Sequence, residues 1–233
     1  MPLPPHPRIV ILTGAGISAE SGLPTFRDAG GLWEGHRIED VATPEAFARD
    51  PATVHRFYNL RRAALANAQP NPAHHALARL EQALPGQVLI VTQNVDNLHE
   101  RAGSRALIHM HGQLTRALCA ACDHRWDAPA LMDHADPCPA CGAPATRPDI
   151  VWFGEMPYQM EAIWTALRGC ELFAAIGTSG QVYPAAAFGQ DAASAGAHTV
   201  EMNLAPSAIS RDFDQIISGP ASQTVPDWVN SLI

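Results

Sequence analysis

Lysine is missing from this chain of 233 residues, and all 15 basic residues are arginine. This excludes chemistry that needs a side-chain ammonium group: a Walker-type phosphate loop, Schiff-base catalysis and a lysine general base. The formal net charge at pH 7 is −8, whereas a nucleic-acid surface would need clustered cations. The sequence therefore argues against nucleic acid as a partner and favours cationic peptides.

Long apolar runs are missing too, since none approaches the roughly 18 residues of a membrane span. Residues 1–8 lack the basic start and apolar stretch of a secretory signal. We therefore expect a cytoplasmic protein without a membrane partner. The length and the 47% hydrophobic content fit one large domain, or one domain that carries a smaller inserted module.

Short apolar runs alternate with segments of helical periodicity along most of the chain. The pattern predicts strands at 8–13, 87–92, 107–110, 172–176 and 199–202, and helices at 73–84, 161–168 and 184–195. An alternation of this kind is typical of an α/β fold with a Rossmann-like, doubly wound parallel sheet.

Two stretches interrupt the alternation and are expected to form a smaller lobe. Residues 32–70 read as a helical insertion, and residues 117–147 are rich in Cys, Pro and Ala with little periodicity. The predicted large lobe then combines residues 1–31, 71–116 and 148–233.

A glycine-rich loop follows the first predicted strand. Gly14 and Gly16 would let the backbone approach a pyrophosphate at the start of the next helix. The loop departs from the dinucleotide fingerprint of dehydrogenases, because Ala19 holds the third glycine position and no acidic residue clearly ends a second strand. By itself the loop fits a nucleotide site or an ordinary tight turn.

Four cysteines form two paired hooks, Cys119-x-x-Cys122 and Cys138-x-x-Cys141, separated by fifteen residues. Such hooks can arrange four thiolates tetrahedrally around one Zn²⁺, and a closed four-Cys site is structural. Two disulfides are the alternative, which a cytosolic location disfavours. Cys170 is expected to be a small buried core residue.

Polar residues stand where two predicted strands end. Gln93, Asn94 and Asp96 follow the strand at 87–92, and His111 follows the strand at 107–110. Ligands of open α/β sheets gather at this edge, and a histidine there could act as a general base. From the residues alone, a solvated turn and a structural histidine remain alternatives, and His109 is nearly as good a candidate as His111.

Together these motifs resemble the sirtuins, a family of NAD-dependent protein-lysine deacylases. The matching residues occur in the family's order and span nearly the whole chain. They are residues 14–18, 21–27, 92–96, 111–112, 147–148, 151–155, 177–179 and 182–186, the four cysteines and Asn203.

The resemblance implies that NAD is consumed as a co-substrate, that acyl-lysine proteins or peptides are the partners, and that nicotinamide and O-acyl-ADP-ribose are released. It implies His111 as the base, with Asn94 and Asp96 positioning the nicotinamide ribose. Further NAD contacts would come from Gly14, Ala15, Gly16, Phe26, Arg27, Gln93, Gly177, Thr178, Ser179, Asn203 and Ala221. The substrate would pair as a strand beside 153–155 and 180–182 and bind through Val151, Phe153, Gly154, Glu155 and Val182.

A tyrosine and an arginine within the helical insertion bear on which acyl group the protein would remove. Tyr58 and Arg61 are three residues apart, so on a helix they share a face and could converge on one small anion. Sirtuins of the class that removes succinyl, malonyl and glutaryl groups carry this Tyr-x-x-Arg pair, with the Arg on the acyl carboxylate, so the resemblance implies that Tyr58 and Arg61 bind the acyl group. Spacing alone leaves Arg62 as an alternative, and an exposed arginine is the non-functional interpretation.

Other functions fit less well. A zinc-ribbon nucleic-acid binder would leave the glycine loop and the acidic charge unexplained. A mono-ADP-ribosyltransferase breaks the same bond to nicotinamide and is the nearest enzymatic alternative, while a noncatalytic NAD-binding scaffold would be expected to lose His111 or Asn94. The resemblance therefore implies an NAD-dependent deacylase of acidic acyl groups, and of acetyl, and we expect a monomer with one structural Zn²⁺.

Overall fold

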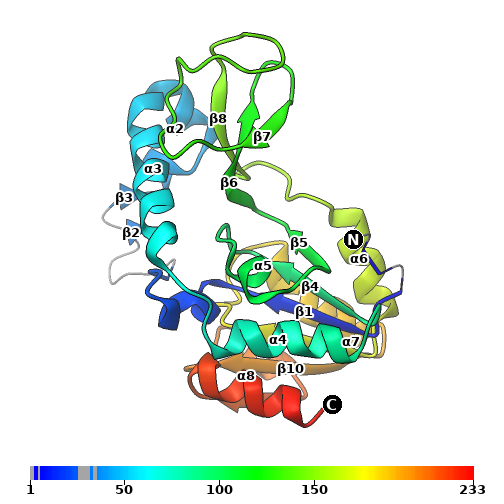
Figure 1. The fold of residues 1–233 in the computed structure, drawn as a ribbon. Coiled ribbons are helices and arrows are strands. Elements are labelled where there is room, and N and C mark those ends of the chain that lie inside the picture. Colours follow the sequence, from blue (N-terminus) through cyan, green and yellow to red (C-terminus); the bar gives the residue numbers. More distant parts are fainter. Residues whose placement is uncertain (1–2, 5, 26–31, 34–35) are drawn as a thin grey trace.

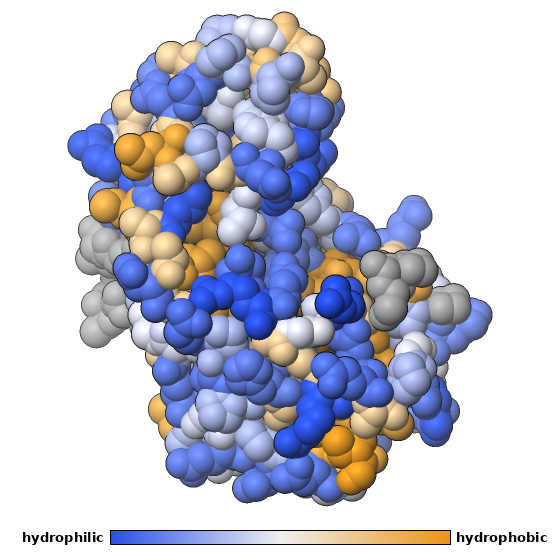
Figure 2. Space-filling model, viewed as in Figure 1, coloured by the Kyte–Doolittle hydropathy of each residue, from blue (hydrophilic) through white to orange (hydrophobic). Residues whose placement is uncertain are grey.

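The fold is described from a computed structural model of the 233-residue chain, over residues 3–4, 6–25, 32–33 and 36–233. Within these ranges no helix has the length and apolar character needed to cross a membrane. On the face shown in Figure 2, hydrophilic residues predominate and hydrophobic ones gather in separate small patches.

A six-stranded parallel sheet forms the centre of the large lobe, in the order β11-β10-β9-β1-β4-β5. Its strands are β1 (Ile9–Thr13), β4 (Val88–Thr92), β5 (Leu107–His109), β9 (Leu172–Ile176), β10 (His198–Asn203) and β11 (Gln215–Ser218). The central strands are buried on both faces, so alternate residues enter different cores.

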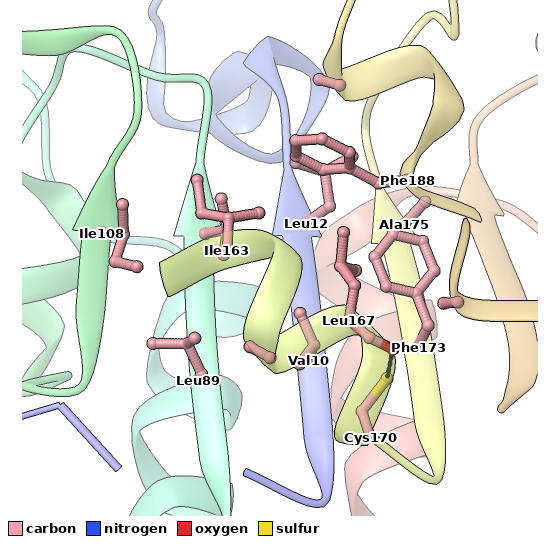
Figure 3. Close-up of a cluster of buried hydrophobic side chains, with 14 of the residues drawn as sticks. Val10, Leu12, Leu89, Ile108, Ile163, Leu167, Cys170, Phe173, Ala175 and Phe188 are labelled. Carbon is pink, nitrogen blue, oxygen red and sulfur yellow. Dashed lines mark hydrogen bonds between the residues drawn. The ribbon is translucent and has the colours of Figure 1, made fainter. Parts of the chain in front are cut away.

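Helices cover both faces of this sheet (Figure 1). On one face α6 (Met160–Gly169) and α7 (Phe188–Ser194) pack over Val10, Leu12 and Phe173 (Figure 3). On the other, α4 (Pro72–Ala83) and α8 (Ala221–Asn230) lie side by side and cover the alternate strand residues. Cys170 is buried in the first core, where its thiol donates to the carbonyl of Leu167, as expected for a structural cysteine.

The small lobe contains helices α1 (Ile38–Val41), α2 (Pro44–Arg49) and α3 (Pro51–Asn67), a two-stranded hairpin of β2 (Leu32–Trp33) and β3 (His36–Arg37), and a three-stranded antiparallel sheet. That sheet has the order β7-β6-β8, with β6 (Gly112–Cys119), β7 (Arg125–Asp127) and β8 (Thr146–Ile150). Side chains of Thr43 and Asp50 accept backbone N–H bonds at the starts of α2 and α3, each followed by a proline.

A third hydrophobic core joins the small lobe to the loop after β4. It combines Tyr58 of α3, Leu114 of β6 and Ile150 of β8 with Leu98 of the short helix α5 (Leu98–Ala102). The lobes are thus packed together at the point where the polar loops begin.

The predicted α/β class, the parallel sheet and the smaller lobe are confirmed, and the predicted strands agree with the observed ones to within one residue at each end. The expected helix at 184–195 divides into a short 3₁₀ helix, η2 (Ala185–Ala187), and α7. Strand β11 and helices α5 and α8 were not predicted: β11 is a short, mostly exposed edge strand, and α8 contains Pro226. The proposed lobe boundaries stay predictions, and β6 runs across the one at 116–117.

Truncation of Phe173 tests the core between the sheet, α6 and α7. Phe173 is 0% exposed, so Phe173→Ala should lower the free energy of unfolding by about 3–5 kcal/mol in denaturant titrations. Ile216→Ala at the 48% exposed edge strand is the control and should cost less than about 1 kcal/mol. Equal losses in the two variants would contradict this placement of the core.

Candidate active site

A cavity of about 770 Å³ lies at the carboxyl ends of the sheet strands and extends to α3 and β8 of the small lobe. Its volume falls within the range of small-molecule sites. Among the predicted site residues that the structure describes, all except the four cysteines line it: Gly14, Ala15, Gly16, Tyr58, Arg61, Gln93, Asn94, Asp96, His111, Val151, Phe153, Gly154, Glu155, Gly177, Thr178, Ser179, Val182, Asn203 and Ala221. Phe26 and Arg27 lie outside the described residues.

The glycine-rich loop is held against the loop that follows β9. The N–H of Gly16 donates to the carbonyl of Gly177 at 2.8 Å. A Cβ at position 16 would lie 2.6 Å from the Cα of Gly177, so a larger residue cannot occupy this position without a shift of the backbone. The loop continues as a 3₁₀ helix, η1 (Ala15–Ser21).

Ser18 connects the polar residues at the floor of the cavity. Its hydroxyl donates to Oδ2 of Asp96 at 3.0 Å and accepts from Nδ2 of Asn94 at 3.2 Å. The other Asp96 oxygen, Oδ1, accepts from the N–H of Leu98 at 3.0 Å. Burial raises the pKa of Asp96, and the bonds from Ser18 and Leu98 oppose that shift. Ser18 was missed as a site residue, although it stands two residues after Gly16 in the loop motif.

His111 is the histidine that lines the cavity in the described part of the chain. Its Nδ1 lies 3.1 Å from the carbonyl oxygen of Gln93, which can only accept, so Nδ1 carries a proton. In the neutral ring the unprotonated nitrogen is therefore Nε2. Burial lowers the pKa of His111 and so favours this neutral form. Nε2 of His109 lies 2.7 Å from Oε1 of Glu100, and His109 does not line the cavity. Of the two histidines considered as the general base, only His111 is therefore placed to act in the cavity.

A glycine directly after His111 fixes where β6 begins. Gly112 has φ +83°, and a Cβ there would meet the carbonyl oxygen of Asp149 at 2.1 Å. The carbonyl of His111 accepts from the N–H of Val151 at 2.9 Å. The backbone of His111 is thus tied to the segment that follows β8.

Another part of the cavity wall is built from the loops after β9 and β10. Nε2 of Gln93 donates to Oγ1 of Thr178 at 3.0 Å, and Nδ2 of Asn203 donates to the carbonyl of Thr178 at 3.0 Å. Asn203 also donates to the buried carboxylate of Glu201 at 3.0 Å. Residues 204–208 complete this wall and were not predicted, since they follow a strand without a distinctive motif.

Helix α3 contributes Tyr58 and Arg61 to the wall on the side of the small lobe. Tyr58 is fully shielded from bulk solvent, whereas Arg61 is half-buried, with its guanidinium carbon 5.5 Å from the centre of the Phe57 ring. Arg62 points elsewhere: it donates to Asn59, does not line the cavity, and burial lowers its pKa to about 10. Of the two arginines that spacing alone left as alternatives, Arg61 therefore lines the cavity and Arg62 does not.

Four cysteine sulfurs gather at the end of the small lobe. All lie within 4.8 Å of one another, with 3.7 Å between Cys119 and Cys141 and between Cys122 and Cys138. Sulfurs at about 2.3 Å from a tetrahedral Zn²⁺ would be roughly 3.8 Å apart, whereas a disulfide needs about 2.05 Å. The quartet therefore fits one structural Zn²⁺. It is separate from the cavity, so it supplies no ligand position for chemistry there.

Comparisons with known proteins show the family to which this chain belongs. Residues 14–184 match the Sir2 family. The chain is 58% identical over 230 residues to the NAD-dependent protein deacylase of Bdellovibrio bacteriovorus, covering 97% of this chain and 96% of that protein. Among solved structures, a Sir2 homolog–NAD complex is 38% identical with a TM-score of 0.88, covering 96% of this chain and 88% of the other. Sir2Af2 bound to a myristoylated histone peptide is 31% identical with a TM-score of 0.73, covering 96% and 90%.

The chain belongs to the Sir2 family. The predicted resemblance to sirtuins is thereby confirmed over most of its length.

Removal of one zinc ligand tests the cysteine quartet. Cys138→Ala should abolish stoichiometric zinc in elemental analysis and lower the melting temperature, because zinc binding contributes on the order of 10 kcal/mol in small zinc peptides. Cys170→Ala, which removes a buried thiol outside the quartet, is the matched control and should keep its zinc. Unchanged zinc content and melting temperature in Cys138→Ala would rule out the assignment.

Proposed function

We propose that this protein removes acidic acyl groups, succinyl and malonyl, and also acetyl, from lysine side chains of other proteins while it consumes NAD. NAD-dependent protein deacylation follows from membership of the Sir2 family and from the activity named for relatives that match almost the full chain. The acyl preference and the residue roles are our own proposal. A monomeric, cytoplasmic state stays a prediction from the sequence.

One observation carries the proposal: a single cavity is lined both by the strand-end loops and by Tyr58 and Arg61. The strand-end loops offer backbone amides, amide side chains and one imidazole, which suits the phosphates and ribose hydroxyls of NAD. Bound there, NAD supplies the ribose carbon to which the acyl oxygen bonds as nicotinamide departs. An acyl-lysine that reaches this carbon would pass along the wall formed by α3 and the segment after β8.

We assign the proton transfer to His111. The bond from Nδ1 to the Gln93 carbonyl leaves Nε2 as the basic nitrogen, and burial keeps the ring neutral to lower pH. Asp96 and Asn94, joined through Ser18, would hold the nicotinamide ribose beside it.

The acyl preference rests on the charge that Arg61 carries at the cavity wall. A guanidinium can bind a carboxylate through two parallel hydrogen bonds, which the methyl group of an acetyl chain cannot form. Arg61 follows Tyr58 by three residues on α3, so the phenol and the guanidinium lie on one face of the helix. A succinyl or malonyl carboxylate therefore gains an interaction that acetyl lacks.

Neutralising Arg61 tests this preference. Arg61→Met should lower kcat/KM for a succinyl-lysine peptide roughly 10- to 100-fold, the loss expected for a hydrogen-bonded charge pair. Turnover of the matched acetyl-lysine peptide should stay within about twofold, because its acyl group makes no such pair. Nicotinamide release gives both rates.

Arg62→Met is the matched control, since it removes the neighbouring guanidinium that does not line the cavity. It should leave the ratio of succinyl to acetyl turnover unchanged. An Arg61→Met variant that keeps the parental ratio would refute the acidic-acyl preference but not deacylation. No nicotinamide release with any acyl peptide would refute both.

The pH dependence of kcat/KM tests His111 as the base. Because burial lowers its pKa and the neutral ring is the active form, the acid limb should lie below the ordinary histidine value of about 6.5. Activity is retained above that limb and is lost as the pH falls through it. The measurement uses acetyl-lysine peptide, whose acyl group does not titrate. His109→Asn should keep the limb in place, and a limb above pH 6.5 in the parent protein would argue against the assignment.

A further inference from the structure

Trp152 donates a hydrogen bond to Tyr58, which lines the cavity on the side of the small lobe. Its indole Nε1 lies 3.0 Å from the hydroxyl oxygen of Tyr58, and the two side chains are 2% and 0% exposed. Trp152 lies in the segment after β8, whereas Tyr58 belongs to α3, so the bond joins two segments that are far apart in the sequence. A buried bond of this kind fixes both groups relative to each other.

The indole itself is held in place by an ion pair. The Arg147 guanidinium carbon stacks 3.6 Å from the centre of the Trp152 ring, and its Nη1 and Nη2 donate to the two Glu155 oxygens at 2.8 and 3.0 Å. Oε2 of Glu155 also accepts the backbone N–H of Trp152 at 2.8 Å. Nη2 of Arg147 donates to the Ile150 carbonyl at 2.9 Å. Trp152 is therefore restrained through its ring face and through its backbone.

Hydrogen-bond chemistry limits the directions in which the Tyr58 hydroxyl can donate its proton. An indole N–H can only donate, so the Tyr58 oxygen accepts at that side and its own proton points in another direction. The guanidinium of Arg61, which also lines the cavity, has only donors and cannot receive that proton. Burial raises the pKa of Tyr58, so the phenol keeps its proton. A ligand group that suits both Tyr58 and Arg61 must be an acceptor, and a carboxylate is such a group.

We propose that Trp152, clamped by Arg147 and Glu155, is a positioning residue that directs the Tyr58 hydroxyl toward the acyl carboxylate and so strengthens the preference for acidic acyl groups. This inference rests on the proposed acidic-acyl function. It also gives Glu155 a role through its carboxylate, which holds Arg147 and Trp152.

A double-mutant cycle between Trp152 and Tyr58 tests the proposal. Trp152→Phe removes the N–H and keeps an aromatic ring for Arg147 to stack on. It should lower kcat/KM for succinyl-lysine peptide roughly 3- to 10-fold, mainly through KM, as expected for a weakened hydrogen bond to a charged group, while acetyl turnover stays at the parental value. In a Tyr58→Phe background the same change should have no further effect, because the group on which Trp152 acts is gone.

Trp164→Phe, on the solvent side of α6, is the matched control and should leave both substrates unaffected. Equal losses for succinyl and acetyl peptides in Trp152→Phe, or additive effects in the cycle, would overturn the proposal and indicate a structural role.

If circular dichroism shows that Trp152→Phe does not fold, Arg147→Met replaces it. In this variant the indole keeps its N–H but loses the guanidinium that stacks on its ring. We again expect a loss of succinyl turnover without a loss of acetyl turnover. Equal losses there would again overturn the proposal.

Failure of this inference is distinguishable from failure of the proposed function. If Arg61→Met abolishes the succinyl preference and Trp152→Phe does not reduce it, the acidic-acyl function stands and the positioning role falls. If Arg61→Met leaves the preference intact, the acidic-acyl function itself falls.

Discussion

The register of three parallel strands is the constraint on which the cavity depends. Thr13 of β1 is paired with Thr92 of β4 on one side and with Ile176 of β9 on the other, so these strands end level. Their loops therefore leave the sheet at the same height and converge. Residues far apart in the sequence, such as Gly16 and Gly177, then come into direct backbone contact, and the absence of side chains at these two positions makes that contact possible.

The polar side chains that line the cavity are held mainly by hydrogen bonds to other groups of the protein. Ser18 joins Asn94 and Asp96, Gln93 reaches Thr178, and His111 is held by a backbone carbonyl. Buried networks of this kind keep their groups in place before a ligand arrives. The small lobe contributes Tyr58 and Arg61 to the cavity wall, and Tyr58 also belongs to the hydrophobic core that joins the two lobes. In the proposed function, acyl preference and proton transfer therefore come from different lobes packed against each other.

Much of this arrangement could be predicted from the sequence because its signals are local. Buried strands read as apolar runs, the cysteine hooks have a fixed spacing, and Tyr58 and Arg61 share a helical period. Spacing alone could not decide between Arg61 and Arg62, because that choice depends on how α3 is rotated against the rest of the small lobe, and only the resemblance to sirtuins favoured Arg61. The roles of Ser18, Arg147 and Trp152 depend on contacts between segments distant in sequence, and no local pattern indicates them. The edge strand β11 was missed because exposed residues remove the apolar signal.

In the proposed function, NAD and the acyl-lysine meet in one cavity and the acyl group ends on ADP-ribose. Mass spectrometry of the products formed from NAD and a succinyl-lysine peptide tests this transfer. We expect one O-succinyl-ADP-ribose for each nicotinamide released and each lysine freed. Free succinate with unchanged NAD, or nicotinamide release that does not require the acyl peptide, would contradict it.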